Sequence, residues 1–385
     1  MNNKFKIIIV FLAVFFIKCY KFKLIEDLDC NSFNLTQIYD DSVSERMDVK
    51  ELFNYNKDTL LIYGLRRNLV SWLSPEIFYD FVSKNTARSV LNQPFSFNSN
   101  TNISSADIIF DENNNTLIYI GWSNLKTKLY QFDIFKNKNI DSLIVFDGQL
   151  YLNKIIKGPE NIIFLGLTHQ NLNKSLLFRV NLVTHKVDNI EISMNQFNVF
   201  NTNKSIFLVA PFVWPSTKIL KLNKESLKID SLKFNSAQVN SIAESENEIY
   251  IGGIGTIPSV GFGFHPYLAQ FNKFGSLIKD TSYTEIDPRG ATIIYLNYFT
   301  NSNGIFSIFR KSEESQFRKR NEIVNNNLSF IKLFTNYDWD CINCDLLSFI
   351  EDSDRCLIGL ITVRTNQGSI QKSNLVRMSP YGLFQ

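Results

Sequence analysis

The 385-residue sequence is poor in histidine, tryptophan, proline and glycine, with 3, 4, 9 and 16 residues respectively. Three scattered histidines are too few for a histidine-rich metal centre, and no Pro- or Ser-rich linker divides the chain. The sequence also lacks a Gly-x-Ser-x-Gly elbow, a His-Glu-x-x-His pair and a phosphate-binding loop. Because a large all-β fold can extend over this length, we expect one domain. Because these motifs are missing from the sequence, we expect no cofactor.

An excess of charge of one sign is also absent. The chain has 40 basic and 37 acidic residues. Lys4, Lys6 and Lys18 belong to an N-terminal leader without acidic residues, so 37 residues of each sign remain beyond it. Nucleic-acid-binding domains normally carry a marked basic excess. We therefore expect no nucleic-acid partner.

The N-terminus has the pattern of an export signal. A basic segment is followed by an apolar run over 7–17, shorter than the roughly 20 residues that cross a bilayer. We predict a signal over 1–18 and a location in a bacterial envelope, periplasmic or outer-surface, or outside the cell. Cys19 stands where a bacterial lipoprotein carries its acylated cysteine, although Lys18 replaces the usual small residue. Release after cleavage, membrane attachment only through lipidated Cys19, and an uncleaved anchor remain alternatives.

One short module recurs about seven times. It is an apolar strand with a small residue inside or just after it, followed by a variable loop and a second strand. The small residues are Gly64, Gly121, Gly166, Ala210, Gly252, Ser307 and Gly359. Their spacing of 42 to 57 positions brackets the roughly 40 to 50 residues of a four-stranded propeller blade. We predict an all-β β-propeller of seven four-stranded blades over 49–385. Within 19–48, a strand-like stretch at 33–39 is a candidate to close the ring, since an open edge would template aggregation.

Turn residues and alternating strands support this division. Clusters of Asn, Asp, Glu and Ser precede each small-residue strand and predict hairpin turns. Alternating apolar and polar residues predict the third strand of each blade, with 328–334 in the sixth. One helix is predicted over 74–84, because Ser74 can cap it and Pro75 suits its first turn. It would be an insertion in the first blade.

One region resembles a known bacterial propeller repeat. Its segments are Tyr250-Ile-Gly-Gly253, Leu268-Ala-Gln-Phe-Asn272, Gly275-Ser-Leu277 and Asp280-Thr-Ser-Tyr283. They are similar to the repeat whose strand ends in Gly-Gly and continues as Ala-Arg-Phe/Tyr-Asn, Gly-Ser-Leu-Asp and Ser-Phe. Ile278-Lys279 interrupt the final part, and 375–383 is a weaker second match. The resemblance covers about 50 residues and implies propeller architecture, not a function.

Aromatic, histidine and arginine side chains gather in the segments after the small-residue strands. Such segments should emerge on one face of a propeller, and loops on a rigid scaffold commonly carry binding residues. The candidate ligand-binding residues are Arg66, Arg67, Trp72, Trp122, Trp214, His265, Arg318 and Arg320. In the alternative interpretation, Trp122 and Trp214 pack between blades and the charged residues are merely solvated. A protein or a glycan would suit the first interpretation.

Five cysteines leave several pairings open in an exported protein. Cys341-x-x-Cys344 lacks the second pair of a zinc site and the α/β context of a redox motif. The expected register places Cys344 about 16 Å from Cys356, beyond the roughly 7 Å limit for a disulfide. We consider Cys30 paired with Cys341 or Cys344, a Cys341–Cys344 bridge, or free thiols, with Cys356 an ordinary buried strand residue.

No metal site is predicted. The stretch Asp111-x-Asn113-x-Asn115 lacks the later Gly and Glu of a calcium loop, so we expect a hairpin turn. Asp338, Asp340 and Asp345 form an acidic cluster that we expect to be solvated. The sequence therefore favours an exported, monomeric, non-catalytic binding propeller of the cell envelope or surface. Two alternatives remain: a lyase or hydrolase with Asp, His and Arg converging at the central channel, and a structural surface protein.

Overall fold

The computed structural model describes residues 36–40, 45–68, 75–90, 94–97, 102–169, 172–211, 216–235, 237–256, 264–282, 292–299, 304–313, 318–324, 330–334, 344–352, 356–364 and 371–378. The regular elements of these ranges are β-strands, numbered β1 to β28. Within the same ranges, no helix has the length and apolar character needed to cross a membrane. The predicted export signal and Cys19 lie outside them.

The strands form seven four-stranded antiparallel sheets, named sheets 1 to 7 here. Sheet 1 contains β2 (Glu45–Asn54), β3 (Thr59–Asn68), β4 (Glu76–Ser83) and β5 (Phe95–Phe97). Sheet 2 contains β6 (Asn102–Asp111), β7 (Thr116–Ser123), β8 (Lys126–Asp133) and β9 (Lys138–Phe146). Sheet 3 contains β10 (Tyr151–Lys157), β11 (Ile162–His169), β12 (Lys174–Asn181) and β13 (Val187–Ile190). Sheet 4 contains β14 (Asn198–Asn201), β15 (Ser205–Val209), β16 (Ser216–Asn223) and β17 (Ile229–Asn235).

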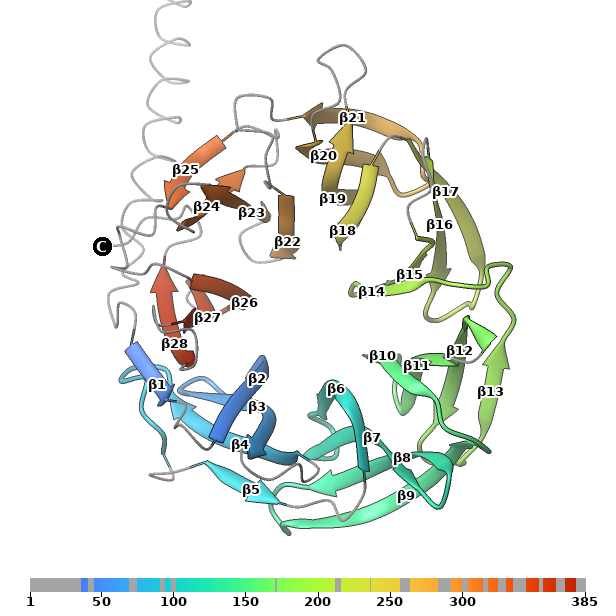
Figure 1. Cartoon of the computed structure of the whole chain (residues 1–385), viewed down its shortest axis with the longest axis vertical. Coiled ribbons are helices and arrows are strands. Elements are labelled where there is room, and N and C mark those ends of the chain that lie inside the picture. Colours follow the sequence, from blue (N-terminus) through green and yellow to red (C-terminus); the bar gives the residue numbers. More distant parts are fainter. Residues whose placement is uncertain are drawn as a thin grey trace, which may run out of the picture.

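Sheet 5 contains β18 (Ala237–Glu244), β19 (Glu248–Thr256), β20 (Phe264–Asn272) and β21 (Leu277–Ser282). Sheet 6 contains β22 (Thr292–Phe299), β23 (Gly304–Glu313), β24 (Arg318–Val324) and β25 (Phe330–Phe334). Sheet 7 is β26 (Cys344–Glu351), β27 (Leu357–Arg364), β28 (Gln371–Met378) and β1 (Thr36–Asp40). Figure 1 shows the sheets side by side around a ring, with the first strand of each nearest the centre. The expectation of an all-β β-propeller is confirmed.

The two ends of the chain meet in sheet 7. β1 pairs antiparallel with β28, and Thr36 lies opposite Leu375. The sheet therefore takes its outermost strand from the N-terminal part of the chain and its other three strands from the C-terminal part. A strand within the stretch suggested for closure thus joins the ring by backbone hydrogen bonds, which covers an edge that would otherwise be open.

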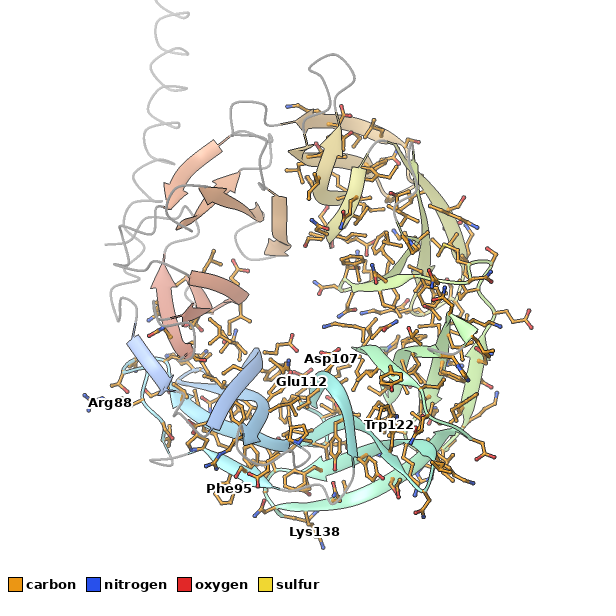
Figure 2. The ribbon with its side chains drawn as sticks, viewed as in Figure 1. Arg88, Phe95, Asp107, Glu112, Trp122 and Lys138 are labelled. Carbon is orange, nitrogen blue, oxygen red and sulfur yellow. The ribbon has the colours of Figure 1, made fainter. Side chains whose placement is uncertain are left out.

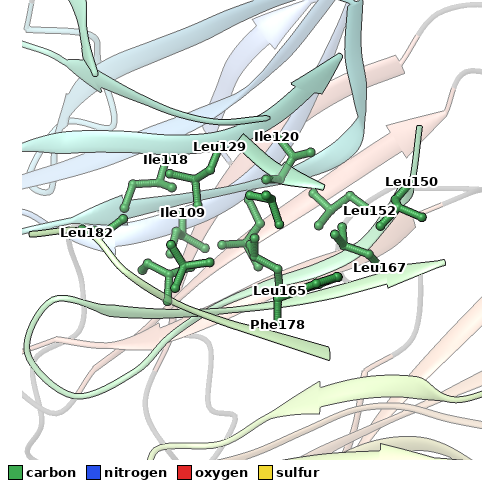
Figure 3. Packing of buried hydrophobic residues seen from close by; sticks show 14 residues of the cluster. Ile109, Ile118, Ile120, Leu129, Leu150, Leu152, Leu165, Leu167, Phe178 and Leu182 are labelled. Carbon is green, nitrogen blue, oxygen red and sulfur yellow. The ribbon is translucent and has the colours of Figure 1, made fainter. Parts of the chain in front are cut away.

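Apolar cores lie between neighbouring sheets, and β7 shows how its sequence produces them. Leu117 and Tyr119 pack in the cluster shared with sheet 1, whereas Ile118 and Ile120 pack in the cluster shared with sheet 3 (Figure 3). All four side chains are fully buried. A strand covered on both faces needs apolar residues at successive positions, which explains the unbroken apolar runs of the repeated module.

Two local predictions are wrong. The stretch expected as a helix at 74–84 contains β4, which pairs with β3 along its whole length. Its Ile, Phe, Tyr and Val residues favour a strand buried on both faces, and this packing outweighs the capping signal of Ser74 and Pro75. The stretch at 328–334 contains β25, the fourth strand of sheet 6, because Arg318–Val324 forms the third strand.

A buried ionic cluster joins sheet 7 to sheet 1. The Lys84 Nζ lies 2.7 Å from Asp352 Oδ1, and the Arg377 Nη2 lies 3.2 Å from Asp352 Oδ2. Only 3%, 3% and 7% of the Lys84, Asp352 and Arg377 side chains are exposed. Nearby, the Asn54 Nδ2 donates to the Glu351 carbonyl at 2.7 Å. Polar contacts thus reinforce the same seam that the paired strands close.

Cys356 differs from the expectation of an ordinary unpaired strand residue. It lies in the hairpin before β27, is buried, and is disulfide-bonded. Cys344 lies opposite Val363, two residues beyond the expected Ile361, because the hairpin turn is longer than expected and the pairing shifts between Leu346 and Ser348. The other cysteines considered for disulfides, Cys30 and Cys341, lie outside the described residues.

Candidate functional site

Irregular pairing recurs at one level of the inner strands. In five sheets the inner strand carries one extra residue relative to its neighbour. The extra residues are Lys50, Asn153, Asn240, Ile294 and Leu347. β6 has a wider irregularity between Ile103 and Ile108. Because a bulge redirects the side chains beside it and is common at functional sites, the residues flanking these bulges form the candidate site.

Glu51 follows the bulge of β2 and lies opposite Tyr63 of β3. The Tyr63 hydroxyl donates a hydrogen bond to Glu51 Oε2 at 2.9 Å. Tyr63 is buried, whereas the Glu51 side chain is exposed. The buried phenol therefore holds the orientation of a carboxylate that solvent can still reach.

Asp107 joins sheet 2 to sheet 3 in the same region. Its Oδ2 accepts the Ile155 backbone N–H at 2.8 Å, and the Lys154 Nζ lies 3.4 Å from both carboxylate oxygens. The Asp107 side chain is 16% exposed and that of Lys154 is 41% exposed. Figure 2 shows Asp107 near the centre of the ring, whereas Arg88, Phe95 and Lys138 lie at its periphery.

Electrostatic coupling ties these groups into one unit, the inner-strand cluster of Glu51, Tyr63, Asp107 and Lys154. The protein atoms packed around both carboxylates reduce their hydration and so raise the pKa of Glu51, although solvent still reaches it, and of Asp107; repulsion by Asp107 raises the pKa of Glu51 further, while Lys154 opposes both shifts. Burial also opposes the charge of Lys154, but the carboxylates of Asp107 and Glu51 together raise its pKa. The pKa of Tyr63 is raised by burial and by Glu51.

A second ionic contact lies further along the same pair of inner strands. The Lys157 Nζ lies 3.2 Å from Asp111 Oδ1 and 3.2 Å from Glu112 Oε1. Asp111 also accepts hydrogen bonds from Asn113 and Asn114 within the turn between β6 and β7. This geometry is that of the expected hairpin turn, and it fixes sheet 2 against sheet 3.

The chemistry available in the inner-strand cluster is hydrogen bonding to an oriented ligand. Two carboxylates accept and one ammonium donates, and protein partners already fix the direction of each carboxylate. No group of three or more His, Cys, Asp or Glu side chains suited to a metal ion occurs in the part of the chain that the structure describes.

Trp122 is the predicted ligand-binding residue whose surroundings are clearest. Its Nε1–H donates to the Leu150 carbonyl at 2.9 Å, and its ring meets Tyr151 edge-on at a centroid distance of 5.0 Å. Both partners belong to sheet 3 or the segment leading into it. The indole therefore packs between sheets 2 and 3, as the alternative interpretation of this residue holds.

The other predicted residues divide into two groups. Arg66 and Arg67 lie in β3, His265 in β20, and Arg318 and Arg320 in β24. All lie in strands, beside the connection between the second and third strands of their sheets, so the topology brings their backbones to one rim. Arg66 Nη1 donates to Ser96 Oγ at 3.3 Å. Trp72 and Trp214 lie outside the described residues.

The inner-strand cluster was not predicted from the sequence. Its charged members occur 12 to 14 positions before the small residue of three successive modules: Glu51 before Gly64, Asp107 before Gly121 and Lys154 before Gly166. Aligning the modules would have revealed this recurrence. The change of sign from Asp107 to Lys154 concealed it, because no single residue type repeats.

Comparisons with known proteins agree with the architecture. No protein-family model and no curated protein sequence matches the chain. Among solved structures, the propeller of Dos1 is similar at a TM-score of 0.54 and 10% identity, covering 85% of this chain and 78% of that chain. Hsv2p of Kluyveromyces lactis is similar at a TM-score of 0.51 and 10% identity, covering 86% of this chain and 98% of that chain. Similarity at this level of identity shows the fold alone.

Proposed function

We propose that the chain is an exported, monomeric, seven-bladed propeller of a bacterial envelope that binds a glycan without catalysis, each sheet forming one blade. The observation that carries the proposal is the convergence of Glu51, Asp107 and Lys154 from three successive inner strands. The N-terminal pattern supports export, either with release or with a lipid anchor at Cys19. The ring supplies a rigid frame on which these side chains keep fixed positions.

A sugar suits the cluster because its hydroxyl groups both donate and accept hydrogen bonds. Glu51 and Asp107 provide acceptors, and Lys154 provides a donor. Lys50 lies close enough to Asp107 to oppose the rise of its pKa, so the two basic and two acidic side chains balance. This balance favours a neutral or zwitterionic ligand over a polyanion. The rim residues Arg66, Arg67, His265, Arg318 and Arg320 would extend the contact.

A glycan array followed by calorimetric titration tests the proposal. Wild-type protein, Glu51→Gln and Lys154→Met would be titrated with the saccharides that bind on the array. A hydrogen bond to a charged group contributes about 1.5–3 kcal/mol, so each variant should bind about 10- to 150-fold more weakly. Glu112→Gln is the matched control, because it removes a carboxylate in the turn directly after an inner strand, outside the cluster. Absence of saccharide binding, or equal binding by all four proteins, would contradict the proposal.

One observation favours an enzyme as the second candidate. Glu51 and Asp107 are neighbouring carboxylates with raised pKa values, and such pairs can serve as acid and base in glycoside hydrolysis or elimination. The saccharides bound on the array would be incubated with the protein and analysed for new reducing or unsaturated ends. Turnover lost in both Glu51→Gln and Asp107→Asn would establish the enzyme. Binding without turnover would leave the binding function.

A further inference from the structure

The connections between third and fourth strands expose apolar side chains at one repeated position. In sheets 2, 3 and 5 this position is the second residue after the third strand, and its side chain is 63%, 68% and 83% exposed, respectively. These residues, called the tip residues here, are Phe135, Val183 and Phe274. Exposed apolar side chains continue into the fourth strands of sheets 2, 4 and 5 as Ile140, Ile229, Leu277 and Ile278.

The turns do not need apolar tip residues in order to form. Asp133, the last residue of β8, accepts the backbone N–H groups of Phe135 at 3.0 Å and Lys136 at 2.9 Å through its Oδ1. Asn272 Oδ1 accepts the Phe274 N–H at 3.0 Å in the same way. In sheet 4, Asn223 forms this turn with Glu225 at the tip position. Because the turn accepts a polar residue there, the apolar tip residues are available for a contact outside the fold.

These turns lie along the outer rim of one face of the ring. Neighbouring strands of each sheet are antiparallel, so the third-to-fourth connection lies at the end of the sheet opposite to the second-to-third connection. Figure 1 shows the fourth strands at the outside of the ring, and Figure 2 shows Lys138, which follows one of the turns, at the periphery. The third-to-fourth connections of sheets 2 to 5, called the outer turn rim here, therefore face away from the rim that carries Arg66 and His265.

Lysine side chains accompany the tip residues. The outer turn rim contains five lysines and one glutamate. Lys136 and Lys186 each contact an aspartate, but 64% and 70% of the two lysine side chains are exposed, against 9% and 37% of the aspartates. The Lys273 Nζ lies 5.2 Å from the centroid of the Phe274 ring. Nearer the axis, the first-to-second turns of the same sheets contain three glutamates and one lysine, so the basic and apolar character belongs to the outer turn rim.

We propose that the outer turn rim docks the protein on a bilayer that contains anionic phospholipids, with the tip residues inserted among the headgroups. Single apolar side chains on three different sheets do not form one contiguous patch for a protein partner, whereas a flat, fluid surface meets all of them together. The exposed ammonium groups beside them match anionic headgroups. This orientation turns the rim with Arg66 and His265 away from the bilayer. The contact is additional to the lipid anchor considered at Cys19 and does not depend on glycan binding.

Co-sedimentation with vesicles tests the proposal, using the chain secreted with its leader and carrying Cys19→Ser, so that no acyl chain is attached. This protein should bind vesicles of equal parts phosphatidylglycerol and phosphatidylcholine, and should bind pure phosphatidylcholine more weakly. Phe135→Ser and Phe274→Ser should each weaken binding about 5- to 30-fold, because most of an exposed phenylalanine leaves water on insertion. No binding, or equal binding to both kinds of vesicle, would overturn the proposal.

The opposite face supplies matched controls. Leu125 and Leu172 are 75% and 67% exposed in second-to-third connections. Leu125→Ser and Leu172→Ser should bind vesicles as the parent protein does, and an equal loss of binding in tip and control variants would overturn the proposal. All four serine variants should melt within about 1 °C of the parent protein, because they change exposed side chains.

Fluorescence quenching provides a second measurement that reports position. The added indole of Phe274→Trp should be quenched by vesicles with brominated acyl chains, whereas that of Leu172→Trp should not. The natural tryptophans give the same background in both variants. Quenching of both added indoles, or of neither, would overturn the proposal. Glycan binding is measured separately, so failure here leaves the proposed function standing.

Discussion

Replacing Asp352 by asparagine removes the only negative charge from the described ionic cluster between sheets 7 and 1. The amide keeps the shape of the carboxylate but removes the negative charge that the buried Lys84 and Arg377 side chains, 3% and 7% exposed, lie against. Removing one partner of a buried ion pair costs about 3–5 kcal/mol. With an unfolding entropy of about 2.1 cal/mol/K per residue, the 385-residue chain should lose about 4–6 °C in Tm.

Calorimetry and circular dichroism of Asp352→Asn at pH 7 measure this loss. The matched control is Lys186→Met, because Lys186 pairs with Asp188 at 3.0 Å on the surface, with 70% and 37% of the two side chains exposed. An exposed pair contributes about 0–1 kcal/mol, so the control should melt within about 1 °C of wild type.

A triple variant separates charge burial from a general loss of packing. Replacing Lys84, Asp352 and Arg377 together by Met, Leu and Met should recover most of the stability, because apolar groups of similar volume remove the buried charges. An Asp352→Asn protein that melts within about 1 °C of wild type would refute the reasoning. Failure of the triple variant to regain stability would show that the cluster acts through shape and not through charge.

Three further changes have expected outcomes. Trp122→Phe leaves a backbone carbonyl of the sheet 2–3 interface without its donor and should lower the free energy of unfolding in urea by about 1–2 kcal/mol; unchanged stability would contradict that role. Burial lowers the pKa of Lys224 to about 8, so the unfolded chain binds more protons above that pH. Wild type should therefore gain about 2 kcal/mol relative to Lys224→Met between pH 8 and pH 10, whereas parallel pH profiles would oppose this. In Gly253→Ala the new Cβ would lie 1.8 Å from the Gln238 carbonyl oxygen, so folded yield should collapse; in Gly255→Ala the Cβ meets the Tyr267 Cβ at 3.0 Å, a much milder clash that a small shift relieves, so that variant should retain more folded protein. Equal yields would count against the steric argument.

The strand pattern of the chain could be predicted because it depends on local sequence. Leu117 to Ile120 form an apolar run in a module of blade length, and the turn residues before it mark a hairpin. The prediction failed at β4, where Ser74 and Pro75 imitate a helix start. Neighbouring sheets bury both faces of 76–83, and that packing is absent from any local window.

The candidate site depended on information that no single segment contains. Glu51, Asp107 and Lys154 are separated by roughly 50 residues in the chain and come together because their strands occupy equivalent inner positions of successive sheets. For Trp122 the residue type predicts a ligand contact, which stays a prediction. Only the structure shows that the neighbouring sheet supplies a carbonyl for its indole.

The sequence by itself determined the strands, the turns and the β-propeller class, since hydrophobic periodicity and turn chemistry act over a few neighbouring residues. Only the tertiary structure decided which strands became inner strands, where their bulges placed charged side chains, and that β1 completes sheet 7. These features depend on contacts between residues as far apart as Lys84 and Asp352. Their energies arise from burial and charge pairing across sheets, which a linear pattern does not encode.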